Sequence, residues 1–248
     1  MIENCVLSLA NFMIATPQVL EMRALLRRTD TKYLVPANLI ENALVFLEAH
    51  YFILCAGEHR VATYETLYFD TMDFSHYHAH RRGVRFRSKI RIRHYVERSL
   101  SFLEIKKKVS GSESSKNRIE IKYRNNNFTD CNAAFISENL PDYRQLKPVL
   151  WTNFNRITLL SKSKNERVTI DFNLKFEGNG KFNFSNAAVV EIKQAPTDPL
   201  SPAIMCMKSL NQRPVSFSKY CTAVTFLHPH IPKNNFLPVI KKLVRMTA

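Results

Sequence analysis

The sequence predicts a mainly β protein of the α+β class, in which a closed antiparallel β-barrel is flanked by a few peripheral helices. The first observation is the segment RFRSKIRIR at residues 85–93, which places a cation at every second position. A helix would scatter these five charges, whereas a strand puts them all on one face and Phe86, Ile90 and Ile92 on the other. Because like charges on one face repel each other, the pattern indicates that an anion lies among them.

The second observation is that other segments alternate charged residues with apolar or packing residues in the same way. They lie at residues 28–33, 102–108, 118–124 and 189–193. One such strand could be an ordinary solvated basic face. Five of them favour a closed sheet with a charged interior and a packed exterior. The length of 248 residues suits an all-β barrel that forms a single domain.

The expected elements follow from periodicity and turn signals. Strands are expected at 25–34, 64–69, 85–93, 101–109, 117–123, 149–160, 167–174, 187–193 and 220–226. Pro36 and Asn38 open a helix that runs to His50, and residues 71–83 form a loop or short helix. Helices are also expected at 132–139, before Pro141, and at 202–210. The small polar residues of SGSESSK at 110–116 predict a loop between two strands.

Composition limits the kind of partner. The chain carries 36 Lys and Arg against 21 Asp and Glu, a formal net charge of +15, and 45% of its residues are hydrophobic. It therefore has ample material for a core, and its charge suits nucleotides, inorganic phosphate chains, nucleic acid or an anionic membrane surface. Charge alone does not choose among these. The five cysteines are widely spaced without a C-x-x-C pair, which favours reduced thiols in a cytoplasmic protein over a disulfide framework or zinc site.

The domain organisation is expected to be simple. Residues 1–22 are interpreted as a loosely attached leader or helix, and Met13 or Met22 could serve as the true start. Residues 23–230 form the barrel domain, and 231–248 form a basic tail. No stretch approaches the ~18 uninterrupted apolar residues of a membrane span, and Glu3 stands where a signal peptide needs basic residues.

An ordered set of motifs resembles the VTC domain, a polyphosphate polymerase domain of the CYTH or triphosphate tunnel metalloenzyme superfamily. The motifs cover residues 25–226 in the order of the family. They are RRTDTKYLV at 27–35, YETLYFDTMDF at 64–74, RFRSKIRIRHY at 85–95, FLEIKKK at 102–108, NRITLL at 155–160, RVTID at 167–171, VVEIK at 189–193 and FSKY at 217–220.

The resemblance implies a tunnel of about eight antiparallel strands that binds a triphosphate with divalent Mn²⁺ or Mg²⁺. It implies an ATP-dependent polymerase that moves the terminal phosphate onto a polyphosphate chain, whereas other branches hydrolyse triphosphates or cyclise ATP. The first strand of the superfamily usually carries two glutamates and a lysine. Here the pattern is Arg28, Asp30 and Lys32, a departure that favours the VTC branch and leaves few carboxylates for a two-metal hydrolytic site.

The cations are the candidate phosphate ligands, because an arginine fork meets two phosphate oxygens and a lysine adds a compact charge. The catalytic candidates are Arg91, Arg93, Lys219 and Lys32. The phosphate-binding candidates are Arg28, Arg87, Lys89, Lys106, Arg156 and Arg167.

The metal needs hard oxygen ligands. Glu191 is the main candidate, because it lies between apolar neighbours and two residues from Lys193. Asp171, Glu104 and Glu120 are weaker candidates. A structural ion pair with a neighbouring cation is the alternative for each of these carboxylates.

Two other functions remain open. A triphosphatase would use the same tunnel with water as the acceptor, and a non-catalytic module would only bind polyphosphate or RNA. Recognition of RNA usually adds exposed aromatic residues between the basic ones, whereas Ile, Leu, Val and Phe of the packing type alternate with the cations here. Nucleic acid is therefore not expected as a partner, and coupling to a membrane would need another protein.

Overall fold

A computed structural model of the chain describes residues 8–22, 28–110, 113–140 and 146–247, and it confirms the α+β class with an antiparallel sheet. The strands are β1 (Thr29–Pro36), β2 (Tyr51–Ile53), β3 (Ala62–Asp70), β4 (Arg87–Tyr95), β5 (Leu100–Ser110), β6 (Glu113–Ile121), β7 (Lys147–Ser161), β8 (Glu166–Gly178), β9 (Gly180–Phe184) and β10 (Ala187–Gln194). The α-helices are α2 (Pro17–Met22), α3 (Ile40–Glu48), α4 (Ser75–Arg82), α5 (Asp130–Asn139), α6 (Pro202–Ser209), α7 (Lys219–Leu227) and α8 (Leu237–Thr247). Short 3-10 turns are η1 (Ala37–Leu39), η2 (Val96–Arg98) and η4 (Asn234–Phe236).

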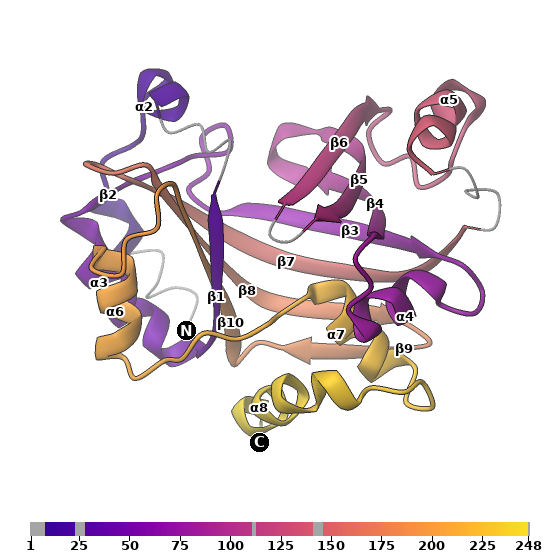
Figure 1. Cartoon of the computed structure of the whole chain (residues 1–248). Helices are drawn as coiled ribbons and strands as arrows, with labels where there is room; N and C mark the ends of the chain where they lie inside the picture. The colour runs from indigo at the N-terminus through magenta and orange to yellow at the C-terminus, as the bar shows by residue number, and fades with distance from the viewer. Residues whose placement is uncertain (1–7, 23–27, 111–112, 141–145, 248) are drawn as a thin grey trace.

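The ten strands form one sheet in the order β1-β10-β8-β7-β3-β4-β5-β6, with β2 added to β7 and β9 added to β8 (Figure 1). The prediction of a closed barrel was wrong, because β1 and β6 end this path and do not pair with each other in the described residues. The edge of β1 bonds instead to the segment before α7. The amide of Val215 donates to the carbonyl of Lys32 at 2.7 Å, and Pro214 forms a bridge with Tyr33.

The sheet is nevertheless strongly curved (Figure 1). In a flat sheet, β1 and β5 would lie about 29 Å apart, because six steps of ~4.8 Å separate them. The charges of Lys32 and Asp30 on β1 nevertheless affect the pKa of Lys106 on β5. The sheet therefore curls until β5 approaches β1. We call its concave side the lumen face. The register places the odd-numbered residues of β4 and the even-numbered residues of β5 on that face.

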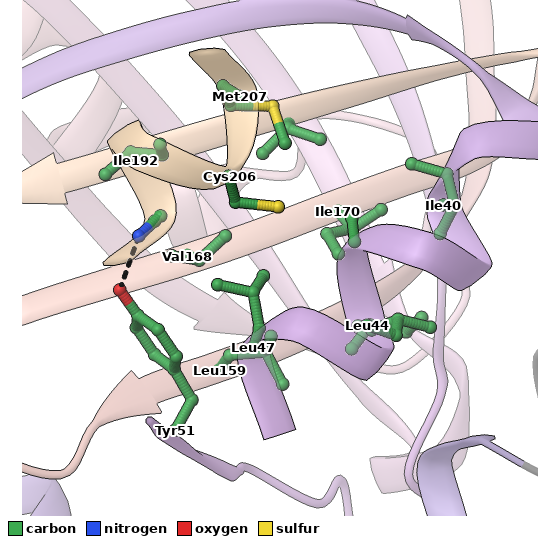
Figure 2. Close-up of a cluster of buried hydrophobic side chains, with 14 of the residues drawn as sticks. Ile40, Leu44, Leu47, Tyr51, Leu159, Val168, Ile170, Ile192, Cys206 and Met207 are labelled. Carbon is green, nitrogen blue, oxygen red and sulfur yellow. Dashed lines mark hydrogen bonds between the residues drawn. The ribbon is translucent and has the colours of Figure 1, made fainter. Parts of the chain in front are cut away.

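The core packs in three places. The outer face of β1, β10, β8 and β7 is covered by α3 and α6, where Leu44, Leu47, Ile170 and Met207 interlock (Figure 2). The outer face of β4 and β5 packs near α5. At one end of the lumen face, α7 fills the concavity together with side chains from α4 and α8. The charged part of the lumen face is therefore bordered by an apolar plug.

The helix α7 corrects the prediction of a strand at 220–226. Its sequence YCTAVTF is rich in β-branched and aromatic residues, which favour strands by local propensity. The Oγ atom of Ser218 instead caps the helix by accepting from the amide of Cys221 at 3.3 Å. Seven of the nine helical residues are buried, so tertiary packing decides the conformation.

The loop predicted at 110–116 was also wrong in most of its length. Strand β5 continues to Ser110 and β6 begins at Glu113, while residues 111–112 lie outside the described residues. Ser115 and Lys116 are exposed on this outermost strand, where small polar residues cost little burial. The other predicted strands and helices overlap the observed ones.

The two ends of the chain pack against the domain where the structure describes them. Leu9 and Phe12 are buried in the core, and the guanidinium of Arg60 donates to their carbonyl oxygens at 2.7 and 2.9 Å. In the basic tail, α8 buries Val239 and Leu243. Residues 1–7 of the predicted leader lie outside the described residues. None of the described helices is both long and apolar enough to cross a membrane.

Candidate functional site

The strand register brings most of the predicted site residues onto the lumen face. Adjacent pairs are Arg91 with Glu104, Lys89 with Lys106, Arg156 with Asp171, and Lys32 with Glu191. Arg93 and Arg167 lie on the same face, because their cross-strand partners Phe102 and Lys193 do. Lys219 enters from the first turn of α7. The local cause is the period of two in each strand, which sends every charged residue of the ladder to the same side.

Three carboxylates of this face, the buried Glu104 and Asp171 and the partly buried Glu191, are each held by two cations. Glu191 lies 3.5 Å from the Nζ atom of Lys32 and 2.8 Å from that of Lys193.

Asp171 accepts hydrogen bonds from Nε and Nη2 of Arg156, with Nη2 at 2.7 Å from Oδ2. The ammonium of Lys219 also binds Asp171. Glu104 receives Nε and Nη2 of Arg91 at 2.7 and 2.6 Å and the ammonium of Lys116. Charge-assisted bonds of this kind fix the orientation of both partners.

These ion pairs keep the carboxylates ionised. Burial alone would raise the pKa of Glu104, yet Arg91, Arg93 and Lys116 hold it well below the ordinary value. In the same way, burial raises the pKa of Asp171, but Arg156 and Lys219 outweigh it and lower the pKa to about 2. For Glu191, Lys32 and Lys193 outweigh burial and lower the pKa well below the usual range. All three groups are therefore weak proton acceptors at neutral pH.

A second set of cations on the lumen face has no such partner. Among the described residues, no carboxylate lies within 4.0 Å of the charged groups of Lys89, Lys106, Arg93 and Arg167. The buried Nε of Arg167 has no hydrogen-bond acceptor at all.

Arg93 is 7% exposed, donates to Oγ1 of Thr66 at 3.1 Å, and lies 5.3 Å from the centre of the Tyr64 ring. Unpaired buried cations are costly unless an anion is supplied.

The charges of this second set repel each other. Lys106 is exposed as a residue. Desolvation of its ammonium group, followed by the charges of Lys32 and Lys89, lowers its pKa to about 8. Desolvation also lowers the pKa of Lys89, with Lys32 and Arg91 adding to the effect. Lysines from β1, β4 and β5 thus converge across the lumen. A bound anion would relieve this repulsion, so the arrangement is suited to binding one.

Some predicted residues lie apart from this centre. Arg87 turns to the start of the strand, where it donates to Nδ1 of His80 at 3.1 Å and to the carbonyl of Val84 at 2.6 Å. Arg28 precedes β1 and pairs with Asp30 at 3.0 Å. Glu120 is exposed on β6. These three side chains stand at the margins of the lumen face.

Three further residues contact the site, although the sequence did not assign them to it. Lys193 binds Glu191, and its position two residues beyond Glu191 on one strand was a usable signal. Lys116 was hidden in the predicted loop. Tyr68 accepts a hydrogen bond from Nη1 of Arg91 at 3.1 Å, but a tyrosine at that position reads as ordinary packing in the sequence.

The carboxylates of the lumen face offer few free oxygens to a metal ion. Among the residues that the structure describes, no three His, Cys, Asp or Glu side chains come together as a metal cage. The oxygens of Glu104 and Asp171 are already shared among arginine and lysine groups, whereas Glu191 has lysine partners only. Mg²⁺ and Mn²⁺ sites of enzymes commonly combine one or two carboxylates with substrate phosphates and water. Glu191 could supply such a carboxylate.

Comparison with known proteins agrees with this geometry. The model of the VTC domain family matches residues 27–228. The chain belongs to the VTC domain family. No curated protein sequence matches it significantly.

Among solved structures, a candidate adenylyl cyclase from Hippeastrum, described as having a dominant triphosphatase activity, has a TM-score of 0.52 at 14% identity, covering 81% of this chain and 96% of that one. A candidate adenylate cyclase from Bacillus halodurans has a TM-score of 0.50 at 14% identity, covering 76% and 92%. At 14% identity the two neighbours show only that the fold is shared. In this chain the VTC domain is built on an open, curled antiparallel sheet.

Proposed function

We propose that this VTC domain is a phosphotransferase that handles triphosphates on its lumen face and moves the terminal phosphate of ATP onto a polyphosphate chain. The cations of the lumen face would bind the phosphates, with Arg91, Arg93, Lys219 and Lys32 nearest the transferring group. Arg156, Arg167, Lys89 and Lys106 would hold the rest of the phosphates. Phosphoryl transfer requires mainly positioning and neutralisation of charge, which a cationic groove supplies.

The low pKa values of the lumen carboxylates support phosphate, and not water, as the acceptor. Water needs a general base to become a good nucleophile. The three ion-paired carboxylates of the lumen face are bound to cations and have lowered pKa values. The end of a phosphate chain is already anionic at pH 7, because its second pKa is about 6. It can attack without a base, so the site favours a phosphate acceptor over water.

Glu191 would hold Mg²⁺ or Mn²⁺ on the bound triphosphate. When bound, the ion neutralises phosphate oxygens and orients them. Lys32 and Lys193, whose ammonium groups contact Glu191, would then contact phosphate instead. This exchange lets the same residues serve as structural ion pairs before binding and as phosphate ligands afterwards.

Two further parts of the proposal concern partners and location. The cations concentrate on a concave face, which suits a slender phosphate chain better than a nucleic acid duplex. Three described cysteines, Cys55, Cys206 and Cys221, are free thiols, which favours a reducing compartment such as the cytoplasm.

A triphosphatase is the second candidate, because the similar Hippeastrum structure is described as having a dominant triphosphatase activity. Both candidates require the same triphosphate site and differ only in the acceptor. A non-catalytic polyphosphate-binding module is the third, and it would use the cations without turnover.

The test is an incubation of the purified protein with ATP and Mn²⁺, assayed in parallel for acid-labile phosphate polymer and for free phosphate. We expect polymer to account for most of the ATP consumed. The variant R93A should lose turnover far more than affinity for a long phosphate chain, because many cations share the ground-state charge. K241A, on the exposed face of α8, is the matched control. Free phosphate without polymer would support the triphosphatase, and binding without any product would support the module.

A further inference from the structure

A second buried carboxylate system lies beside the site and is used by none of the steps above. Asp70, at the end of β3, is fully buried, and no Lys or Arg of the described residues lies within 4.0 Å of it. It accepts hydrogen bonds from the amides of Thr71, His76 and Tyr77 at 2.7, 3.0 and 2.9 Å. The last two amides belong to the first turn of α4, whose N-cap Phe74 offers no capping side chain. Asp70 thus satisfies orphan donors at a positive helix end.

The hydroxyl of Thr71 also donates to Asp70, at 3.3 Å, and a further donor comes from α7. The hydroxyl of Tyr220 donates to Oδ2 of Asp70. Burial and the charge of Asp70 raise the pKa of Tyr220 well above its ordinary value, so this hydroxyl keeps its proton. The ring of Tyr220 stacks on Tyr68 at 5.0 Å between centroids. Tyr68 in turn accepts from Arg91, so a chain of contacts joins Asp70 to the site.

The neighbour of Tyr220 in the sequence is Lys219, whose ammonium binds Asp171 on the lumen face. The first turn of α7 is therefore held at two points by consecutive residues. Tyr220 fixes it to β3 and α4, and Lys219 reaches across to β8. A lysine side chain has four flexible carbons, so the place of its ammonium depends on where the helix turn is held.

We propose that Asp70 and Tyr220 are positioning residues, which hold the first turn of α7 so that Lys219 meets the transferring phosphate. This inference rests on the proposed function. A reacting group displaced by about 1 Å can lose up to about a hundredfold in rate. Loss of the Tyr220 hydroxyl should therefore lower turnover although Tyr220 touches no substrate.

The test is a double-mutant cycle with Y220F and K219A. Y220F keeps the ring and its stacking but removes the bond to Asp70. We expect Y220F to lower kcat about tenfold in the wild-type background, with little change in KM, and to change kcat less than about twofold in the K219A background.

The matched control is Y51F. Tyr51 also donates from a buried hydroxyl to a carboxylate, Glu166, and it accepts from the amide of Ala203 at 3.2 Å in the outer core (Figure 2). Thermal melts should show that Y51F loses at least as much stability as Y220F, while its kcat stays within about twofold of the wild type.

The outcomes distinguish failure of the positioning role from failure of the proposed function. If Y220F and Y51F lower kcat equally, or if Y220F acts as strongly in the K219A background, the positioning role is overturned. If K219A itself changes neither turnover nor the rise in melting temperature on adding tripolyphosphate, the proposed function of the lumen fails instead. The tripolyphosphate melt needs no activity, so the second result can be read even in an inactive protein.

Discussion

At the scale of single residues, the lumen carboxylates differ in how completely their oxygens are used. Glu104 and Asp171 are 1% and 2% exposed and are bound by an arginine fork and a lysine. Glu191 has only lysine partners, and one of them stands at 3.5 Å. An ammonium is a mobile point charge that can exchange a carboxylate for a phosphate. Glu191 is therefore the carboxylate that can change partners on binding.

E191Q should lower Mn²⁺-dependent turnover of ATP by roughly a hundredfold or more, because the electrostatic contribution of the metal is lost. Affinity for tripolyphosphate without metal should be kept or increased, since Lys32 loses its carboxylate partner and Lys193 keeps only Asp30 at 3.3 Å. Steady-state kinetics and ligand melts measure the two effects. The control is E120Q on the exposed strand β6, which should change neither. Full activity of E191Q in Mn²⁺ would make Glu191 a structural residue.

Lys106 gives the site a pH dependence. Its pKa of about 8 means that its charge disappears as the pH rises through 8, so the affinity for tripolyphosphate should fall there. We expect a loss of about tenfold between pH 7 and pH 9, the order of one charge-assisted hydrogen bond. K106R keeps its charge and should flatten the curve. K116R is the control, because Lys116 also has a pKa of about 8 but serves Glu104. A curve that K106R leaves unchanged would assign the titration elsewhere.

The ligand-free protein should respond to the same titration with the opposite sign. The folded-state pKa of Lys106 lies below its ordinary value of 10.5, so the unfolded chain binds more protons between pH 8 and 10.5. Stability from this group therefore rises with pH across that window. As the pH rises, the affinity for tripolyphosphate should therefore fall while the stability of the protein without ligand increases.

At the scale of elements, the Asp171 pairs join α7 to the sheet. Arg156 and Lys219 are only 16% and 12% exposed. D171N should therefore leave two poorly solvated cations and lower the free energy of unfolding by about 3 kcal/mol. Denaturant unfolding measures this loss, and tripolyphosphate should restore part of it by replacing the anion. D198N, which breaks the more exposed pair with Lys164, should cost much less. Equal losses would mean that the Asp171 pairs are no better than surface pairs.

The elements also show what the sequence could and could not predict. The ladder in β4 and its partners were predictable, because period-two alternation is a local signal that fixes both strand and face. It also brought Lys32, Arg91 and Glu191 to one side without any knowledge of contacts. Closure was not predictable, because the pairing of β1 with residues 214–215 instead of β6 joins distant parts of the chain. The conformation of α7 was hidden because burial overrides the strand propensity of Val224 and Thr225.

At the scale of the whole molecule, the net charge is +15, and Lys89, Lys106 and Arg91 contribute to it where the curled sheet faces itself. The cations of the lumen face repel each other, and a bound polyanion should reduce this repulsion. Tripolyphosphate at about 100 times its Kd should stabilise the protein by about 2.7 kcal/mol, which corresponds to a rise in melting temperature of about 5–10 °C. Orthophosphate at equal ionic strength is the control and should give a much smaller rise. Equal shifts would indicate a generic basic surface.

The central claim is that the phosphoryl group passes to a phosphate acceptor and not to water. The most direct measurement is turnover of ATP with Mn²⁺ in water enriched in ¹⁸O, followed by mass spectrometry of the products. We expect most of the transferred phosphorus in chains that carry no ¹⁸O from solvent. Free phosphate with one solvent ¹⁸O per molecule, in amounts equal to the ATP consumed, would contradict it and make the lumen a hydrolytic site.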